Sequence, residues 1–196
     1  MTTVIVDYRR GNVQSVCRAI EKCGGTFELS PRPEDLARAD RVILPGVGAF
    51  GDCIGKLRSM GFVEPLQEFA KTGKPFLGIC VGMQIFHTGG EEFGAHDGLN
   101  YIPGKVTAIP KVDANGKPHK IPHIGWTPLA VPQGQDASYW DGTILEGQEV
   151  GAPVYFVHSY TASPDDPSHR LADAHYNGVL IGAAVKRDNL TGVQFH

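Results

Sequence analysis

Long hydrophobic runs are absent from this chain of 196 residues. The most apolar stretches, such as GVLIGAAV at 178–185, fall far short of the roughly 18 residues that a membrane-spanning helix needs, and the N-terminus does not have the pattern of a signal peptide. We therefore expect a cytoplasmic protein without a membrane segment. The formal net charge is −3 and no basic stripe is present, which argues against nucleic-acid binding, because phosphate contacts need clustered lysine and arginine.

Cysteine is scarce as well, and the four cysteines, Cys17, Cys23, Cys53 and Cys80, show no Cys-x-x-Cys spacing. A chain of this length folds without disulfides, so free thiols are expected. Neither the cysteines nor the eight histidines have the spacing of metal ligands, and we predict no metal site. With 41% hydrophobic and 20% charged residues, the composition is typical of a single globular domain.

The order of the elements predicted from apolar periodicity indicates an α/β fold. In the first half, β-rich runs at 4–7, 26–29, 41–44 and 75–79 alternate with helical stretches that begin at 13, 33 and about 52. Such alternation implies a mostly parallel sheet with helices on both faces, a three-layer, flavodoxin-like arrangement. Ligand chemistry is then expected at the carboxyl ends of the strands.

The second half of the chain has a different character. Strand-like runs at 105–109, 124–129, 154–160, 171–176, 180–185 and 191–195 are joined by turns rich in proline and glycine. We expect antiparallel strands that extend the sheet. Asn115-Gly116, within the polar segment 111–120, indicates a hairpin or an exposed loop.

Cys80 is the strongest candidate for chemistry, because the strand PFLGI runs directly into Gly78-Ile79-Cys80-Val81-Gly82. This is the spacing of the G-x-S-x-G nucleophile elbow, with sulfur in place of oxygen. We expect a strained backbone at the cysteine, with flanking glycines that let neighbouring segments approach. The helix that follows favours the thiolate and offers the Val81 N–H to a developing oxyanion. The alternative is a buried structural cysteine.

A second glycine cluster, PGVGAFG at 45–51, formally matches the dinucleotide-binding pattern G-x-G-x-x-G. That pattern normally follows the first strand and needs an acidic residue at the end of the next one, whereas here the next strand ends in Cys80. We therefore interpret the cluster as a flexible loop whose N–H groups lie beside the elbow and serve an oxyanion hole.

The base for Cys80 must come from a distant part of the sequence. Most of the eight histidines fall in polar loops or on a helix, but His158 lies within YFVHSY and His196 ends the apolar run GVQF. A histidine in or at the end of a β-run of the second half is the better candidate. The residues alone leave His158 and His196 open.

Several motifs together resemble one known group of enzymes. They are DYRRGN at 7–12, LPGVGAF at 44–50, GICVGMQ at 78–84, PHIGW at 122–126, YFVHSY at 155–160 and GVQFH at 192–196. GICVGMQ and QFH are typical of class I glutamine amidotransferases, and the motifs in this order resemble, from end to end, the glutaminase subunit of imidazole glycerol phosphate synthase. The resemblance implies the α/β fold of that class.

The resemblance also implies an activity and a role for individual residues. Cys80 is expected to attack the carboxamide of glutamine, with His196 as the general base and then as the acid for departing ammonia, so that a thioester forms and is hydrolysed to glutamate. The other implied positions are Val47, Gly48 and Val81 for the oxyanion, Gly46, Gln84, Ser159 and Tyr160 for glutamine, and Asn12, His123 and Trp126 for a partner interface.

The implied partner is a (β/α)8-barrel cyclase. In this group the ammonia passes into the barrel, which makes imidazole glycerol phosphate and an aminoimidazole carboxamide ribotide in histidine biosynthesis, and the glutaminase uses no cofactor. The resemblance further implies a glutaminase that is nearly idle until the barrel binds its substrate. The peptide PGVG at 45–48 is the expected switch, because a peptide beside glycine reorients at low steric cost.

The chain departs from the group where its last motif closes. That motif runs His-Pro-Glu-Lys-Ser in the group, whereas the sequence here ends at His196. We expect a single domain over residues 1–196 that is cut before this motif and a final helix. Reduced activity is expected for residues 1–196 alone, because they lack the glutamate of this motif and the carboxylate of a triad orients its base. Smaller departures are Arg9, often glycine, and Thr127, usually asparagine.

Other functions remain open on the sequence. One is a glutaminase that feeds another ammonia-using synthase, against which PHIGW and YFVHSY together argue. Another is a non-catalytic α/β binding module in which Cys80 is redox-sensitive or inert, and a cysteine-histidine ester hydrolase is a weaker third. Selective labelling of Cys80 by a glutamine-mimicking electrophile separates the enzyme from the binding module.

Overall fold

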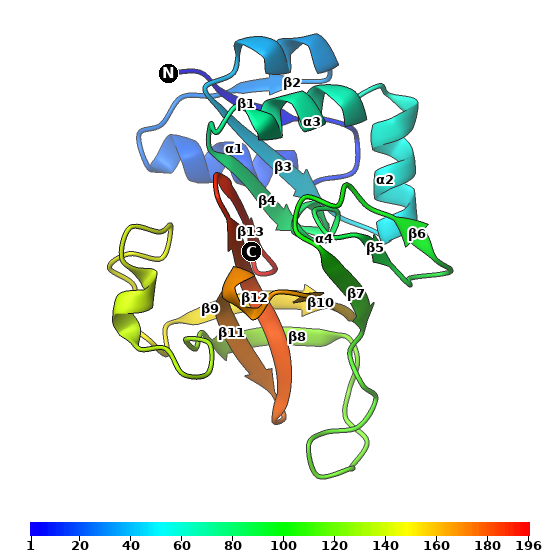
Figure 1. The fold of residues 1–196 in the computed structure, drawn as a ribbon, viewed down its shortest axis with the longest axis vertical. Coiled ribbons are helices and arrows are strands. Elements are labelled where there is room, and N and C mark those ends of the chain that lie inside the picture. Colours follow the sequence, from blue (N-terminus) through cyan, green and yellow to red (C-terminus); the bar gives the residue numbers. More distant parts are fainter.

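A seven-stranded sheet forms the centre of the molecule (Figure 1). The computed structural model describes residues 1–196. The strand order is β11-β12-β13-β4-β3-β1-β2, in which β13 to β2 run parallel and β12 and β11 add antiparallel strands at one edge. The bounds are β1 (Thr3–Val6), β2 (Glu28–Ser30), β3 (Arg41–Gly46), β4 (Phe76–Cys80), β11 (Arg170–Tyr176), β12 (Val179–Arg187) and β13 (Leu190–Val193). This arrangement confirms the predicted α/β fold.

Helices cover the two faces of this sheet unequally. They are α1 (Val13–Lys22), the 3-10 turn η1 (Pro33–Arg38), α2 (Phe50–Ser59), α3 (Val63–Lys71) and the single turn α4 (Val81–Gln84). Phe50 and Leu57 of α2 and Phe69 of α3 lie in the same core as Val42 and Leu44 of β3. α1 lies on the opposite face, and none of its residues is fully buried. None of the helices combines the length and the apolar character needed to cross a membrane.

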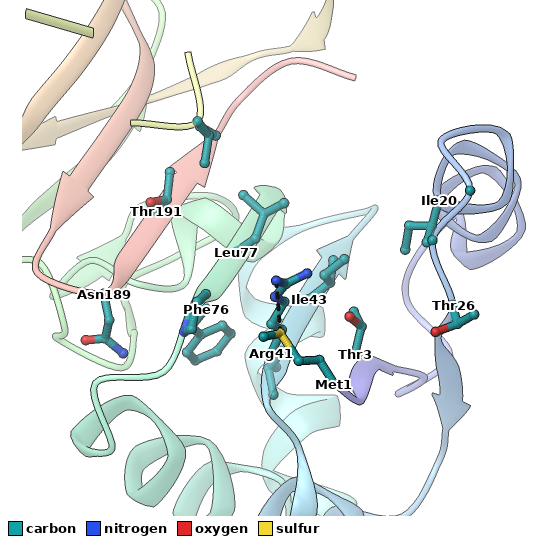
Figure 2. A pocket seen from close by; sticks show the side chains of 15 residues that line it. Met1, Thr3, Ile20, Thr26, Arg41, Ile43, Phe76, Leu77, Asn189 and Thr191 are labelled. Carbon is teal, nitrogen blue, oxygen red and sulfur yellow. Dashed lines mark hydrogen bonds between the residues drawn. The ribbon is translucent and has the colours of Figure 1, made fainter. Parts of the chain in front are cut away.

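The sheet face on the α1 side keeps an apolar depression. One part of it, about 460 Å³ in volume, lies over Ile43, Phe76 and Leu77 (Figure 2). A second part, about 610 Å³, shares Ile43 and Leu77 with the first and continues past Ile79 to His196. α1 covers only part of this face, because its ten residues span about 15 Å.

The second half of the chain also forms two smaller sheets. β7 (Gly104–Ala108) pairs with β10 (Tyr160–Pro164) and with the short β5 (Gly89–Gly90), which pairs with β6 (His96–Asp97), while β8 (His123–Pro128) and β9 (Pro153–His158) form a separate antiparallel ribbon. The two remaining turns are η2 (Ala137–Trp140) and η3 (Pro167–His169). The single strand predicted over 154–160 was wrong, because the chain changes sheet at Ser159 and continues as β10. The predicted turn at Asn115-Gly116 lies between Val112 and Pro118, which form an isolated bridge.

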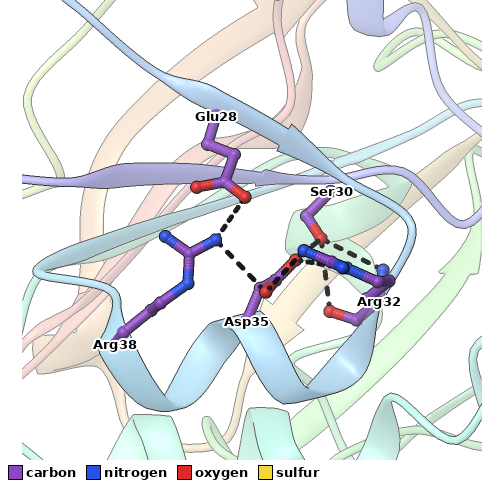
Figure 3. Close-up of polar contacts among 5 residues, drawn as sticks. All are labelled: Glu28, Ser30, Arg32, Asp35 and Arg38. Carbon is purple, nitrogen blue, oxygen red and sulfur yellow. Dashed lines mark hydrogen bonds and ion pairs between the residues drawn. The ribbon is translucent and has the colours of Figure 1, made fainter.

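A buried carboxylate ties η1 to the edge strand β2. Asp35 accepts a hydrogen bond from Ser30 and pairs with Arg32 and Arg38, and Arg38 also pairs with Glu28 (Figure 3). These contacts hold the pKa of Asp35 at about 2, and the Ser30 hydrogen bond contributes most. The cluster joins β2 to the turn that leads into β3.

The carboxyl ends of β3, β4 and β13 meet where β4 turns into α4. Gly46 lies opposite Cys80 in the register of β3 and β4, and Val193 lies opposite Ile79 in that of β13 and β4. Parallel neighbours end at one edge of a sheet, so residues far apart in the sequence come together there. The short segment from Val193 to His196 then leads along this edge.

The turn from β4 into α4 depends on contacts that only glycine permits. A Cβ at Gly82 would overlap the carbonyl oxygen of Leu44, and a Cβ at Gly78 would lie 2.8 Å from the carbonyl carbon of Gly82. Side-chain carbons essentially never come this close to backbone atoms, so the end of β3 and the start of α4 are in direct backbone contact. The expectation that these glycines permit close approach is confirmed.

We expect Gly82→Ala to lower the free energy of unfolding by at least about 3 kcal/mol, because the added methyl group forces β3 and α4 apart. Gly55→Ala is the matched control. Gly55 is exposed in α2 and a Cβ there meets nothing within 4 Å, so this change should stabilise the chain by about 0.5–1 kcal/mol. Urea unfolding followed by circular dichroism measures both. Equal stability of the two variants would contradict the backbone contact.

Candidate active site

The backbone of Cys80 has the conformation expected of a nucleophile elbow. Its φ is 55° and its ψ is −115°, a region that a residue with a side chain rarely adopts and that costs free energy. The conformation persists because the strand before the cysteine and the turn after it are held by the backbone contacts of Gly78 and Gly82. The thiol therefore lies at the carboxyl edge of the sheet, where the sequence predicted chemistry.

A pocket of about 280 Å³ opens at this edge and contains most of the predicted site residues. It is lined by Val47, Gly48, Cys80, Val81, Gln84, Glu92, Pro122, Val157, His158, Ser159, Tyr160 and His196. These residues come from the loop after β3, the elbow and α4, the loop after β5, the position before β8, the β9–β10 junction and the segment after β13. The structure thus brings together the residues expected for catalysis and for the oxyanion, and three of the four expected for glutamine.

Gly46 is the fourth of these and lies behind the pocket. A Cβ at Gly46 would lie 2.6 Å from the backbone nitrogen of Gly82 and 2.9 Å from the Tyr8 hydroxyl. It is therefore in backbone contact with the elbow and does not line the cavity. Through this contact Gly46 places the end of β3 beside Cys80.

Burial dominates the protonation of Cys80. The side chain is only 6% exposed, and burial raises the pKa of the thiol to about 11, although the Val81 backbone and the Gln194 side chain lower it. The start of the following helix does lower the pKa of the thiol, through the Val81 N–H, as expected. Burial raises the pKa by more, so the thiolate is not favoured overall. α4 is a single turn, and its N–H groups do not compensate for the lost hydration of the sulfur. In the free chain Cys80 is a thiol at neutral pH.

The two candidate bases differ in what their imidazoles already bind. His158 Nδ1 lies 2.8 Å from the carbonyl oxygen of Tyr160 and its Nε2 lies 3.0 Å from Nδ1 of His123, so both nitrogens are engaged. The imidazole of His196 has no such partner, and its pKa is lowered by burial alone. A lowered pKa leaves the ring neutral near pH 7, the form that accepts a proton. The geometry favours His196 over His158 as the base.

Two side chains in and around the pocket were missed by the sequence reasoning. Glu92 is the only carboxylate among the lining residues, and its Oε2 accepts the backbone N–H of Phe50 at 2.8 Å. Gln194, fully buried, donates to the sulfur of Cys80 at 3.5 Å. Gln194 belongs to the motif GVQFH, which was a usable signal. Glu92 lies in a polar loop without periodicity, so no pattern pointed to it.

The loop after β3 carries the second set of expected oxyanion donors. The Cys53 thiol lies 3.6 Å from the carbonyl oxygen of Val47, and Gly48 has a φ of 115° with open space around it. A residue with a side chain would be strained at this φ. The cysteine contact and the glycine together set the present orientation of the peptide between Val47 and Gly48.

The residues expected at a partner interface lie in different environments. Trp126 on β8 is 71% exposed, and it lies on the same ribbon as Ile124 (51%) and Val157 of β9 (42%). Asn12 is exposed and caps α1 by accepting the N–H of Ser15 at 3.3 Å. His123, in contrast, is buried, so its side chain reaches an interface only through its neighbours. The exposed face of the β8–β9 ribbon, formed by Ile124, Trp126 and Val157, is called the ribbon face below.

Comparison with known proteins identifies relatives over almost the whole chain. The family model of the class-I glutamine amidotransferases matches residues 4–196. The imidazole glycerol phosphate synthase subunit HisH 1 of Legionella pneumophila (strain Paris) is 47% identical over 193 residues, 98% of this chain and 89% of that protein. The subunit HisH of Geobacter metallireducens is 42% identical over 196 residues, 100% of this chain and 90% of that protein.

Solved structures show the same fold at low sequence identity. A crystal structure of a glutamine amidotransferase matches with a TM-score of 0.72 at 15% identity and covers 99% of this chain and 89% of that one. The structure of PurLQS from Thermotoga maritima matches with a TM-score of 0.69 at 17% identity, over 100% and 86% of the two chains. The family match and the sequence identities together show that the chain belongs to the class-I glutamine amidotransferases and, within them, to the HisH subunits of imidazole glycerol phosphate synthase.

Proposed function

We propose that this chain is the glutaminase subunit of an imidazole glycerol phosphate synthase in the cytoplasm. It hydrolyses glutamine to glutamate and ammonia, and the ammonia passes to a partner cyclase that makes imidazole glycerol phosphate and aminoimidazole carboxamide ribotide. The proposal rests on one observation above all. This chain is 47% identical to a HisH subunit, and its Cys80 lines the same pocket as His196, whose imidazole has no hydrogen-bond partner, at the carboxyl edge of the sheet.

The chemistry follows from the positions of Cys80 and His196. The neutral imidazole of His196 takes the thiol proton as the sulfur of Cys80 bonds to the carboxamide carbon of glutamine. The carboxamide oxygen becomes an oxyanion, for which the N–H groups of Val81 and Gly48 are the proposed donors. The carbon–nitrogen bond then breaks, His196 gives its proton to the departing ammonia, and water hydrolyses the thioester to glutamate.

The pocket also offers groups that suit the other end of glutamine. Its α-ammonium needs an anion, and Glu92 is the only carboxylate among the lining residues. Gln84, Ser159 and Tyr160 supply amide, hydroxyl and backbone groups from the facing side. We therefore add Glu92 to the residues proposed to bind glutamine.

The free subunit is built for low activity. The pKa of the Cys80 thiol, about 11, keeps the sulfur protonated, and the peptide between Val47 and Gly48 is held by its contact with Cys53. A partner that reorients this peptide toward the oxyanion raises the rate without any new catalytic residue. The small Gly48 permits that reorientation.

The ribbon face is the proposed docking surface for the cyclase. Trp126 is a large, rigid side chain with 71% of its surface exposed, and its ring packs edge-on against Tyr155 at 5.6 Å between centroids. Exposed tryptophan beside apolar neighbours is typical of interaction sites.

We expect glutamate release from glutamine to be slow for this chain alone and strongly stimulated by a HisF-type cyclase loaded with a nucleotide substrate analogue. Cys80→Ala should abolish the stimulated activity, because it removes the nucleophile. Cys23→Ala, at an exposed cysteine, should leave it unchanged. An enzyme-coupled glutamate assay measures all three. Activity that survives Cys80→Ala would contradict the proposed mechanism.

We expect Trp126→Ala to weaken binding of the cyclase by about 2 kcal/mol, or roughly thirtyfold in Kd, because the change removes a central aromatic contact. Leu180→Ala, an exposed apolar residue of β12, serves as the control and should leave Kd unchanged. Isothermal titration calorimetry gives both constants. Equal affinities for the two variants would place the interface elsewhere.

We also propose that a carboxylate beside the imidazole of His196 raises its effectiveness as a base. No acidic group of the 196 residues contributes to the pKa of His196, and a carboxylate on the far nitrogen fixes the tautomer of a base. Adding Pro-Glu-Lys-Ser after His196 should raise the stimulated kcat by a factor on the order of 10²–10⁴. An added Pro-Gln-Lys-Ser, which lacks the charge, is the control. The same kcat with both additions would exclude a role for the carboxylate.

A further inference from the structure

Two buried histidines connect the ribbon face to the interior. His123 Nδ1 lies 3.0 Å from His158 Nε2, and the outer nitrogen of His123, Nε2, lies 2.8 Å from the hydroxyl of Thr127. The inner histidine, His158, reaches the carbonyl oxygen of Tyr160 with its Nδ1 at 2.8 Å. His123 and His158 are only 1% and 6% exposed. These contacts form one unbroken series from β8 to the β9–β10 junction.

The direction of each hydrogen bond in this series is set by its inner end. A carbonyl oxygen only accepts, so Nδ1 of His158 carries the proton and its Nε2 accepts from Nδ1 of His123. The remaining nitrogen of His123 then accepts from the hydroxyl of Thr127. Both rings are neutral in this scheme, in line with burial, which lowers the pKa of both and brings that of His158 to about 4.

A second series begins at the same carbonyl and ends at the nucleophile. The side-chain nitrogen of Gln84 lies 3.3 Å from the Tyr160 carbonyl oxygen and 2.8 Å from Oε1 of Gln194. The nitrogen of Gln194 in turn lies 3.5 Å from the sulfur of Cys80. Gln84 and Gln194 are 3% and 0% exposed. The carbonyl of Tyr160 is thus the junction between the histidines and the glutamines.

The far end of the first series lies at a surface. Thr127 is half-buried on β8 and follows Trp126 directly. A partner that binds the ribbon face therefore contacts Trp126, the residue next to Thr127, which is the first donor of the series. Inside the protein such hydrogen bonds are strong and directional, because little water competes for their partners.

We propose that Thr127, His123, His158, Gln84 and Gln194 form a single hydrogen-bond relay that holds the Gln194 amide on the sulfur of Cys80. Gln194 and the two histidines are positioning residues in this relay. Occupation of the ribbon face changes the reactivity of the thiol by shifting the relay. This last step alone rests on the proposed function, which supplies the cyclase as the occupant.

The test compares His123→Asn with His123→Leu. The two side chains have nearly the same shape, and both lose the stacking of the ring on Tyr176 and Phe156 (4.2 and 4.8 Å between centroids). Asparagine keeps a donor near the position of Nδ1, whereas leucine does not. The readout is the rate at which iodoacetamide alkylates Cys80 in the free chain near neutral pH, measured by peptide mass spectrometry.

We expect Leu at position 123 to slow this alkylation about tenfold, the effect of one pKa unit on the thiolate population, and Asn to keep it near the original rate. Thr127→Val removes only the outermost hydrogen bond of the relay, as Asn at position 123 does, and should therefore match Asn and not Leu. Thr3→Val, at a half-buried threonine of β1 far from the site, should have no effect. If Asn and Leu slow the alkylation of Cys80 equally, His123 acts only through packing and the relay is overturned. Unchanged alkylation in all variants would overturn it as well.

A spectroscopic measurement checks the direction of the relay independently. Nitrogen-15 spectra of the imidazoles should show His123 and His158 neutral with the proton on Nδ1, and a proton on Nε2 of either would overturn the scheme. The alkylation and the spectra need neither glutamine nor the cyclase. A chain that alkylates as expected but releases no glutamate would therefore contradict the proposed function and leave the relay standing.

Discussion

The close contact between the backbones of β3 and α4 is the constraint on which the site depends. Gly82 approaches Leu44 so closely that no side chain fits between them, and Gly46 and Gly78 also lie against the backbone of Gly82. This contact holds Cys80 at a positive φ and places the loop after β3 beside the sulfur. The sulfur of Cys80 and the expected oxyanion donors come from different strands. Their relative positions are fixed because Gly46, Gly78 and Gly82 have no side chains that would keep these backbones apart.

The same packing that positions Cys80 also suppresses its reactivity. Burial removes the hydration of a thiolate, and the pKa of about 11 shows that the nearby N–H groups offset only part of this cost. Geometry and protonation are therefore separate controls in this molecule. The first is set by the folded backbone. The second depends on burial and on a few polar groups, of which the Val81 N–H and the Gln194 amide lower the pKa of the thiol.

The ribbon of β8 and β9 links a surface to this control. One side carries Trp126 and its apolar neighbours into solvent, and the other side buries His123 and His158. Alternation along a strand produces this division, because successive side chains point to opposite faces. A ribbon with an exposed apolar face and a buried polar face is well placed to connect binding with chemistry, since both faces belong to the same rigid backbone.

The local patterns were the part of this protein that could be predicted from its residues. The alternating first half, the elbow around Cys80 and the glycine cluster after β3 each follow from short-range rules of periodicity and steric freedom. The long-range choices could not be predicted in this way. The choice between His158 and His196 as the proposed base depends on which imidazole nitrogens are already hydrogen-bonded, and the break at Ser159 depends on which strands are free to pair.

The roles of Glu92 and Gln194 also could not be predicted from local patterns. Their roles arise from contacts with residues far away in the sequence, which no local pattern encodes. The residue types and their spacing determined the elbow that presents Cys80 and the class of fold. Tertiary structure alone decided the buried relay and the burial that keeps the thiol protonated, because hydrogen-bond partners and burial are properties of the packed chain.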